Sequence, residues 1–169
     1  MIWFSSYTSF ISHYADIASR YKLEEFSVGT ELAGVSDDRG RWLKVIQAVR
    51  DRYRGTLVYA ANFNEYSHVF FWGALDLIGI DAHWSLSQHP TANAAKLEQA
   101  WRPIRARLAA FAAEHHRRIL FTEAGYTSAR GTTTLPYSWT ISQTPDQAEQ
   151  AAAYQALLAS FSKQRWWAY

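Results

Sequence analysis

Residues 119–126 read ILFTEAGY: apolar residues in strand-like order are followed by a threonine and then by Glu123. An earlier stretch, FSVGTEL at 26–32, has the same form and reaches a carboxylate at Glu31. Each glutamate stands where a buried strand should reach the protein surface. Because the active site of a parallel barrel lies at one end of its strands, the repeated pattern predicts two carboxylates at one edge of a sheet.

The stretches around these two segments alternate between helix and strand patterns. Helical stretches have apolar residues at spacings of three and four, and strand stretches are short, apolar and rich in β-branched and aromatic residues. The patterns predict helices over 3–21, 36–53, 94–117 and 144–164, a short turn over 64–74, and strands over 26–32, 56–63, 75–84 and 118–126. The closing WWAY at 166–169 has the composition of the start of a fifth strand.

Cap and breaker residues refine the helix boundaries. Residues 36–38, Ser-Asp-Asp, offer N-caps for the second helix, and Thr144 offers one for the last helix, with Pro145 at its first helical position. Pro103 lies inside the long third helix, which it should kink or divide.

Alternating strands and helices imply parallel pairing, which leaves a doubly wound sheet or a TIM barrel. Polar residues lie at the C-terminal ends of four successive predicted strands: Glu31, Asn62, the Asp81–His83 pair and Glu123. A TIM barrel collects its active site from such strand ends, whereas a doubly wound sheet usually carries a GxGxxG turn, which is absent here. We therefore predict an α/β chain that forms a partial (β/α)8 barrel, about five of the eight βα units.

Composition narrows the classes of function. With 49% hydrophobic and 19% charged residues, the sequence is that of one globular domain over residues 1–169. A net charge of +2 without a basic block gives no case for a nucleic-acid or membrane partner. No apolar run suits a membrane span and no signal peptide pattern is present, which leaves the cytoplasm as the default location. No cofactor or metal is expected, because cysteine is absent and His115–His116 lacks zinc-site spacing.

Two carboxylates in one cavity are the groups that glycoside hydrolysis requires. One protonates the leaving oxygen, while the other attacks the anomeric carbon or activates water. A separation of about 5 to 5.5 Å implies retention through a covalent glycosyl-enzyme intermediate. If both point into the barrel mouth, the alternation of strand side chains predicts that the barrel interior contains Gly29 and Ser27 beneath Glu31, and Phe121 and Ile119 beneath Glu123. The aromatic content of 16% is a mild further sign, because flat apolar rings bind the faces of sugars.

The segments FSVGTEL, LVYAANF, FWGALDLIGIDAHW and ILFTEAGYTS, in that order, resemble glycoside hydrolase family 113. This family contains β-mannanase-like enzymes of a large clan of retaining TIM barrels. In that clan the acid/base glutamate ends the fourth strand and the nucleophile glutamate ends the seventh. The resemblance therefore implies that Glu31 is the acid/base, that Glu123 is the nucleophile, and that the strands here are the fourth to the eighth.

The sequence departs from the clan pattern at two positions. Thr30 stands where most members carry the asparagine that holds the sugar 2-hydroxyl, and Asn62 is a candidate to take over part of that role. His83 stands where a tyrosine is expected, and it is a candidate to contact the sugar or the nucleophile. The predicted substrate-binding residues are Thr30, Asn62, His83, Trp84, Tyr126 and Trp139.

Length is the larger departure, since a complete barrel needs about 250 residues. The resemblance implies an endo-acting hydrolase of β-1,4-mannan that lacks the first three strands. We expect the chain alone to be poorly stable and weakly active or inactive, because its edge strands are unpaired and it depends on the missing N-terminal barrel segment as a partner. The alternative is a non-catalytic half barrel or a sugar-binding remnant.

Plainer roles are open for several of these residues. A strand-end glutamate often caps a helix or forms an ion pair, and Asn62 would serve equally well to cap the turn that follows it. His83 and Trp84 suit packing as well as sugar binding. The polar loop over 127–144, which carries Trp139, is either a subsite wall or a mobile surface loop.

Overall fold

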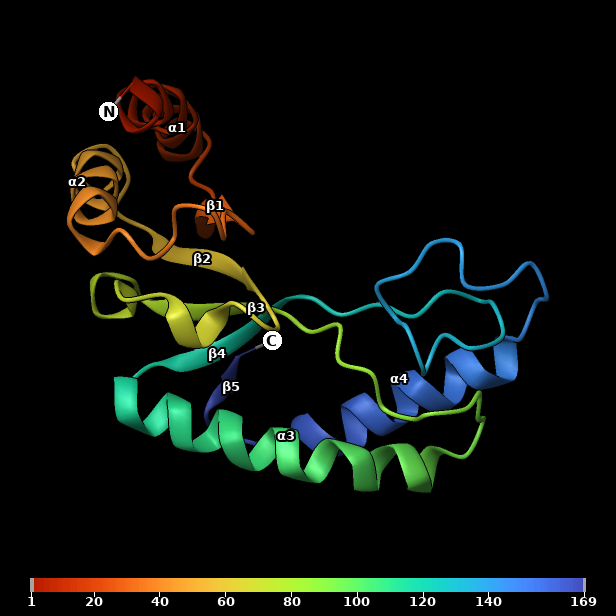
Figure 1. The fold of residues 1–169 in the computed structure, drawn as a ribbon. Coiled ribbons are helices and arrows are strands. Elements are labelled where there is room, and N and C mark those ends of the chain that lie inside the picture. Colours follow the sequence, from red (N-terminus) through yellow and green to blue (C-terminus); the bar gives the residue numbers. More distant parts are fainter. Residues whose placement is uncertain (1, 169) are drawn as a thin grey trace. The chain divides into compact units, whose positions relative to one another are not determined.

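The computed structural model describes residues 2–168. Helices and strands alternate, and the five strands form one parallel sheet in the order β1-β2-β3-β4-β5 (Figure 1), which confirms the predicted α/β class. The short turns η1 (Tyr66–His68) and η2 (Trp72–Ala74) lie between β2 and β3. The helices are α1 (Ile2–Arg20), α2 (Arg39–Arg50), α3 (Ala94–His115) and α4 (Gln147–Phe161), and the strands are β1 (Glu25–Thr30), β2 (Thr56–Asn62), β3 (Leu77–Asp81), β4 (Arg118–Glu123) and β5 (Trp167–Ala168).

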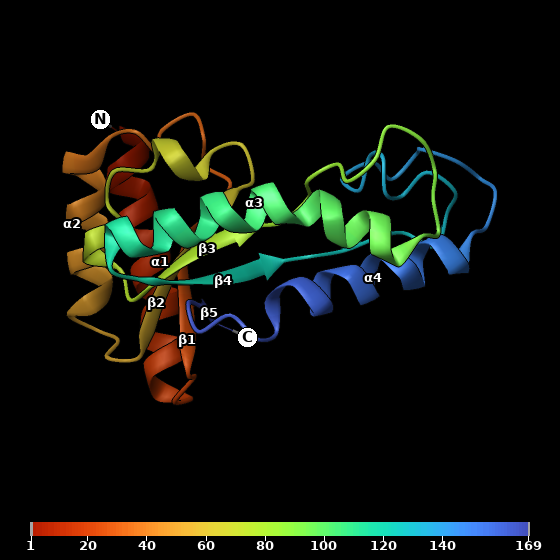
Figure 2. The same cartoon turned by 90° about the horizontal axis from the view of Figure 1, so that it is seen from below.

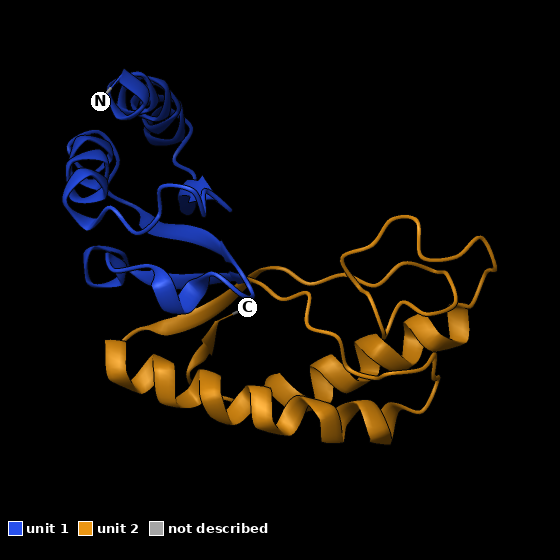
Figure 3. Ribbon diagram, in the orientation of Figure 1, with its two compact units in different colours: residues 1–80 blue, residues 81–169 orange. Residues whose placement is uncertain are grey.

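The chain divides into two compact units, residues 1–80 and 81–169 (Figure 3). The first unit contains α1, β1, α2, β2 and all of β3 except its last residue, and the second contains α3, β4, α4 and β5. Each unit has a parallel strand pair, with Phe26 opposite Leu57 in the first and Ile119 opposite Trp167 in the second. A single domain over the whole chain stays a prediction.

The core of the first unit is an aromatic cluster beneath the end of β1. Trp42 of α2 is fully buried, and its ring lies 5.3 Å from that of Tyr59 and 4.9 Å from that of Phe71. Gly29 of β1 makes room for this cluster, because a Cβ there would lie 2.9 Å from Trp42 and 3.0 Å from Tyr59. Helix α2 is capped by the side chain of Asp38, one of the predicted N-cap candidates.

The core of the second unit lies between β4 and two helices, α3 and α4, which run side by side (Figure 2). The buried rings of Trp101 in α3 and Phe161 in α4 lie 5.1 Å apart, and Phe121 of β4 lies 4.9 Å from Phe161. Helix α3 runs through Pro103 without division. Of the two effects predicted for this proline, division therefore does not occur, because the buried face of α3 outweighs the loss of one helical hydrogen bond.

The start of α4 corrects the predicted cap. The helix begins at Gln147 and not at Pro145, and its N-cap is Asp146. Thr144 is not the cap because its carbonyl accepts a hydrogen bond from the backbone N–H of Arg130 at 2.9 Å, which keeps this segment extended.

Some large aromatic side chains of both units belong to the core, while others are exposed. Trp42, Trp72 and Trp101 are each at most 1% exposed, so packing accounts for much of the aromatic content. The exposed aromatic side chains that remain include Phe70 and Trp139.

Between residues 2 and 168, no helix combines the length and the apolar character that a membrane span requires.

Candidate active site

Glu31 directly follows β1 and leaves strand geometry at once. Its φ angle is +49°, in the left-handed region that non-glycine residues rarely adopt. Its backbone N–H donates to the carbonyl of Ala60 at 2.8 Å, and the N–H of Leu32 donates to the Tyr59 hydroxyl at 2.8 Å. Two hydrogen bonds to β2 therefore hold Glu31 in a conformation that the chain does not favour by itself.

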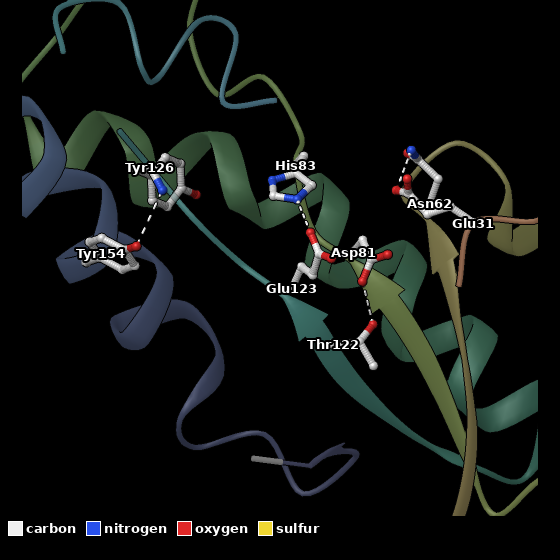
Figure 4. Close-up of polar contacts among 8 residues, drawn as sticks. All are labelled: Glu31, Asn62, Asp81, His83, Thr122, Glu123, Tyr126 and Tyr154. Carbon is white, nitrogen blue, oxygen red and sulfur yellow. Dashed lines mark hydrogen bonds and ion pairs between the residues drawn. The ribbon is translucent and has the colours of Figure 1, made fainter. Parts of the chain in front are cut away.

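The carboxylate of Glu31 points toward the amide of Asn62, which ends β2 (Figure 4). Asn62 Nδ2 donates to Glu31 Oε1 at 2.7 Å, so the strand ends of β1 and β2 are joined through these side chains. The turn after β2 is closed by backbone atoms instead, since the Glu65 N–H donates to the Asn62 carbonyl at 2.8 Å. The Asn62 side chain thus positions Glu31 and does not cap this turn.

A buried tyrosine and glutamate support this pair from below. The hydroxyl of Tyr59 donates to Glu65 Oε1 at 2.7 Å, and Glu65 Oε2 accepts the backbone N–H of Asn62 at 3.1 Å. Burial, followed by the hydrogen bond to Glu65, raises the pKa of Tyr59 far above its ordinary value. The hydroxyl therefore stays protonated. It accepts the N–H of Leu32 and donates to Glu65, which in turn accepts the N–H of Asn62.

Glu123 is the last residue of β4, and a backbone hydrogen bond to the residue after β3 holds it. Its carbonyl accepts the backbone N–H of Ala82 at 2.7 Å. The Glu123 and His83 side chains point toward each other, and His83 Nε2 lies 3.1 Å from Glu123 Oε2 (Figure 4). The carboxylate is 56% exposed, so it is accessible to a ligand, whereas the imidazole is 18% exposed. The structure thus shows the predicted contact of His83 with Glu123.

The residue before Glu123 is tied to β3. Thr122 Oγ1 donates to Asp81 Oδ1 at 2.6 Å, and Asp81 is fully buried (Figure 4). This short hydrogen bond to a carboxylate adds to the backbone pairing of the two strand ends. It therefore fixes the point from which Glu123 extends.

The side chains beneath the glutamates do not face the predicted direction. Phe121 stacks on Trp101 of α3 at 6.4 Å and contacts Phe161 of α4, and the Cα of Gly29 faces Trp42 of α2. These positions face the helix layer, so their predicted placement in a barrel interior is wrong. Strand alternation fails as a guide here because each glutamate lies where its strand ends.

The other predicted substrate-binding residues differ in exposure. Thr30 is exposed at the end of β1, and Trp139 is 89% exposed in the loop before α4. Trp84 is 8% exposed and its ring contacts that of Trp101 at 5.9 Å, which favours the packing alternative. Contact of these three residues with substrate stays a prediction.

Tyr126 is 4% exposed and belongs to the packing of α4. Its backbone N–H donates to the Tyr154 hydroxyl at 3.4 Å (Figure 4). Its carbonyl accepts from the Gln150 side chain at 2.7 Å. Burial raises the pKa of Tyr126 well above its ordinary value. Tyr126 thus anchors the start of the loop that follows Glu123, and its predicted substrate contact also stays untested.

A buried glutamate that sequence reasoning missed fixes this loop. Glu149 of α4 is fully buried; its Oε2 accepts the N–H of Gly131 at 2.8 Å, and its Oε1 accepts the N–H and the hydroxyl of Thr133 at 3.0 and 2.6 Å. The carbonyl of Thr133 accepts the N–H groups of Leu86 and Ser87. Glu149 therefore holds the segment after Glu123 against the segment after His83. The available signal was the spacing of Glu149 with the buried Ala152 and Ala153 on one helical face.

Within residues 2–168, no three carboxylate or imidazole side chains converge in the manner of a metal centre. The structure shows a parallel α/β sheet with a glutamate at the ends of two of its strands, and each glutamate is held by a polar side chain from a neighbouring strand end. That arrangement is typical of the barrel glycoside hydrolases.

The family comparison agrees with this class. The model of Glycoside Hydrolase Family 113 matches residues 1–169, and the chain belongs to that family. Comparison with the curated proteins gives no match.

Solved structures of the family are close in fold. A family 113 β-1,4-mannanase, described as a complex structure, matches with a TM-score of 0.86 and 28% identity over 98% of this chain and 50% of that chain. A family 113 β-mannanase from Alicyclobacillus acidocaldarius, in complex with ManMIm, matches with a TM-score of 0.85 and 30% identity over 98% of this chain and 49% of that one. This chain therefore spans about half the length of these mannanases and matches part of their TIM barrel.

A more distant structure shares the fold alone. A β-glucuronidase from Faecalibacterium prausnitzii matches with a TM-score of 0.69 and 15% identity, over 97% of this chain and 27% of that chain.

Proposed function

We propose that this chain carries the two catalytic glutamates of a retaining glycoside hydrolase that cleaves β-1,4-mannan. Glu31 is the acid/base and Glu123 is the nucleophile. The observation that carries this proposal is that both strand-end glutamates are held by side chains from neighbouring strand ends, Asn62 at 2.7 Å and His83 at 3.1 Å, in a chain that the family model matches throughout.

The proposed reaction is a double displacement. In the first step Glu123 attacks the anomeric carbon, the glycosidic C–O bond breaks, and Glu31 gives its proton to the leaving oxygen. In the second step Glu31 takes a proton from water, whose oxygen attacks the same carbon and releases Glu123. Both steps need the two carboxyl groups about 5 to 5.5 Å apart.

The two partner side chains leave each carboxyl group one oxygen for chemistry. Asn62 Nδ2 occupies Oε1 of Glu31, so the catalytic proton is carried on Oε2. His83 Nε2 occupies Oε2 of Glu123, so Oε1 attacks the sugar. Asn62 and His83 therefore position the two carboxyl groups in this scheme. The proposal also includes contact of each of these side chains with the sugar.

The solved relatives support two further parts of the proposal, the class of substrate and the completion of the barrel by another segment. The solved relatives named as β-1,4-mannanase or β-mannanase support a β-1,4-linked mannan substrate. Because this chain spans about half the length of those proteins, we propose that a further barrel segment supplies the remaining strands before turnover occurs. Thr30, Trp84, Tyr126 and Trp139 are the further residues proposed to contact the polysaccharide.

The proposal is tested by complementation. The chain is co-expressed with the segment of the Alicyclobacillus acidocaldarius mannanase that it does not cover, and release of reducing ends from β-1,4-mannan is measured. We expect turnover that Glu123→Gln abolishes and that Glu114→Gln, a change of an exposed glutamate on α3, leaves intact. Turnover that survives Glu123→Gln, or a complex that binds mannan without cleaving it, would contradict the catalytic proposal, and the second result would favour a sugar-binding half barrel.

A further inference from the structure

Glu65 is the one acidic side chain of the first unit that is buried, among the residues that the structure describes, and it is 5% exposed. It directly precedes η1, in the segment that follows β2. A carboxylate is costly to bury unless donors satisfy its oxygen atoms. Here the donors are the Tyr59 hydroxyl, 2.7 Å from Oε1, and the backbone N–H of Asn62, 3.1 Å from Oε2. Both donors belong to β2, and the reaction scheme above gives Glu65 no role.

The two donors connect Glu65 with Glu31 by separate routes. On one route the Asn62 side chain donates to Glu31 Oε1 at 2.7 Å and holds the carboxyl group (Figure 4). On the other route the Tyr59 hydroxyl accepts the N–H of Leu32 at 2.8 Å and holds the backbone directly after Glu31. One buried carboxylate is therefore connected with both the side chain and the backbone of the proposed acid/base.

These routes require a carboxylate in particular. Burial raises the pKa of Tyr59 far above its ordinary value, so its single hydroxyl proton stays in place and points toward Glu65. The hydroxyl oxygen is then left to accept the N–H of Leu32. Both oxygens of Glu65 accept hydrogen bonds, whereas the amide of a glutamine has one acceptor and would set an N–H against one of the two donors. Glu65→Gln therefore breaks one route with little change of shape.

The backbone at Glu31 depends on such support. Its φ angle of +49° is one that non-glycine residues rarely adopt and that persists where the surroundings fix it. If Tyr59 loses Glu65 as its acceptor, the hydroxyl turns its proton elsewhere and holds Leu32 less well. Glu31 would then relax toward an ordinary conformation, which moves its carboxyl group. A displacement of about 1 Å in a reacting group costs about a hundredfold in rate.

We propose that Glu65 is a positioning residue for the proposed acid/base, and that it orients Glu31 toward the leaving oxygen through Asn62 and Tyr59. Glu65 acts through these two residues and does not itself contact the substrate. This inference rests on the proposed function and deepens it, because it assigns the alignment of proton transfer to a buried carboxylate of the first unit.

The first test uses the chain completed by the further barrel segment, with mannan and with an aryl mannoside whose leaving group needs no proton. Glu65→Gln should lower kcat on mannan about 10- to 100-fold and leave KM within about twofold, because proton transfer is misaligned while the binding surface is kept. Pre-steady-state release of the aryl group should change by less than about twofold. The control is Ile46→Val, a change in the buried core of the same unit, which should affect both substrates equally.

The second test needs no turnover and uses the ¹⁵N-labelled chain alone. Hydrogen exchange at the Leu32 backbone amide and the resonance of the Asn62 side-chain amide report on the two routes. Glu65→Gln should speed exchange at Leu32 about tenfold or more, relative to the amides of β2, and should shift the Asn62 resonance. Tyr59→Phe, which removes only the hydroxyl, should speed exchange at Leu32 in the same way, whereas Ile46→Val should leave the Leu32 exchange unchanged relative to β2.

The outcomes separate the role of Glu65 from the proposed function. Equal losses on both substrates in Glu65→Gln, or unchanged signals of Leu32 and Asn62 in the folded variant, overturn the positioning role. Tyr59→Phe carries the test if Glu65→Gln does not fold, and failure of both variants to fold would overturn the proposal by showing that Glu65 serves the fold instead. The proposed function fails independently, if turnover in the complementation assay does not depend on Glu123.

Discussion

The two strand-end glutamates occupy different settings. Glu31 follows its strand in a left-handed conformation, with φ at +49°, and its partner is the neutral amide of Asn62. Glu123 is the last residue of its strand, and its partner is the imidazole of His83. One carboxylate is therefore aimed by an unusual backbone and the other by an ordinary strand end.

The partner groups differ in kind, as the backbones do. The neutral amide of Asn62 donates to Glu31 Oε1, whereas a ring nitrogen of His83 lies 3.1 Å from Glu123 Oε2. The backbone at Glu31 costs about 1 to 3 kcal/mol and persists because Tyr59 and Ala60 hold it, a pattern that is typical of functional sites.

The largest expected effects test the assignment of Glu31 as acid/base and Glu123 as nucleophile, in the chain completed by the further barrel segment. Glu123→Gln should lower turnover about a thousandfold or more on every substrate, because the nucleophile is lost. Glu31→Gln should cost about 100- to 10,000-fold on mannan but little in the first step with an aryl mannoside, whose leaving group needs no proton. Pre-steady-state release of the aryl group measures this, and equal losses for both variants on both substrates would contradict the assignment.

The next effect concerns the loop that follows Glu123. Glu149→Ala should lower the free energy of unfolding by about 3 kcal/mol, because it leaves the N–H groups of Gly131 and Thr133 and the Thr133 hydroxyl without their acceptor. Urea unfolding measures the loss, and amide hydrogen exchange at Gly131 and Thr133 locates it. An exposed glutamate changed in the same way, Glu114→Ala, is the control, and equal effects would show that Glu149 does not hold the loop.

A smaller effect concerns the strand that leads to Glu31. Gly29→Ala should lower the free energy of unfolding by about 1 to 3 kcal/mol, because the new Cβ would meet the buried rings of Trp42 and Tyr59. Gly34→Ala is the matched control, since no heavy atom lies within 4 Å of a Cβ there. Chemical denaturation of both variants measures the difference, and similar values would show that the rings can move aside.

The smallest expected effect is a difference in stability between Gly and Ala at each of the two glutamate positions. At position 31, Gly should be more stable than Ala by about 1 kcal/mol, because the left-handed conformation suits glycine. At position 123, Gly should be less stable than Ala by about 0.5 to 1 kcal/mol, because glycine loses more conformational freedom when it is fixed in a strand. Thermal unfolding of the four variants measures the difference in stability between Gly and Ala at each position. A difference of the same sign at both positions would contradict the proposed difference between the two backbones.

The sequence predicted those features that depend on local composition. The alternation of strands and helices and the polar residues at the strand ends can be recognised in the sequence, because the spacing of apolar residues and the residue types change at these positions. His83 was predicted as a possible partner of the nucleophile, and the structure shows its contact with Glu123.

The features that sequence reasoning missed depend on backbone conformation and on long-range contacts. The left-handed angle at Glu31 is fixed by Tyr59, which is 28 positions further along the chain, and no residue type announces it. Alternation placed Phe121 on the wrong side of β4 because Glu123, from which it was counted, lies where the strand ends. Glu149 was not identified from the sequence, because its partners lie in a polar loop that resembles a mobile one.

The most direct test of the account is the separation of the Glu31 and Glu123 carboxyl groups in a crystal structure with a bound mannooligosaccharide. The account predicts about 5 to 5.5 Å, with both groups facing the same glycosidic bond, as retention requires. A separation of about 6.5 to 9.5 Å would indicate inversion, and groups more than about 10 Å apart without a shared cavity would contradict the two-glutamate mechanism.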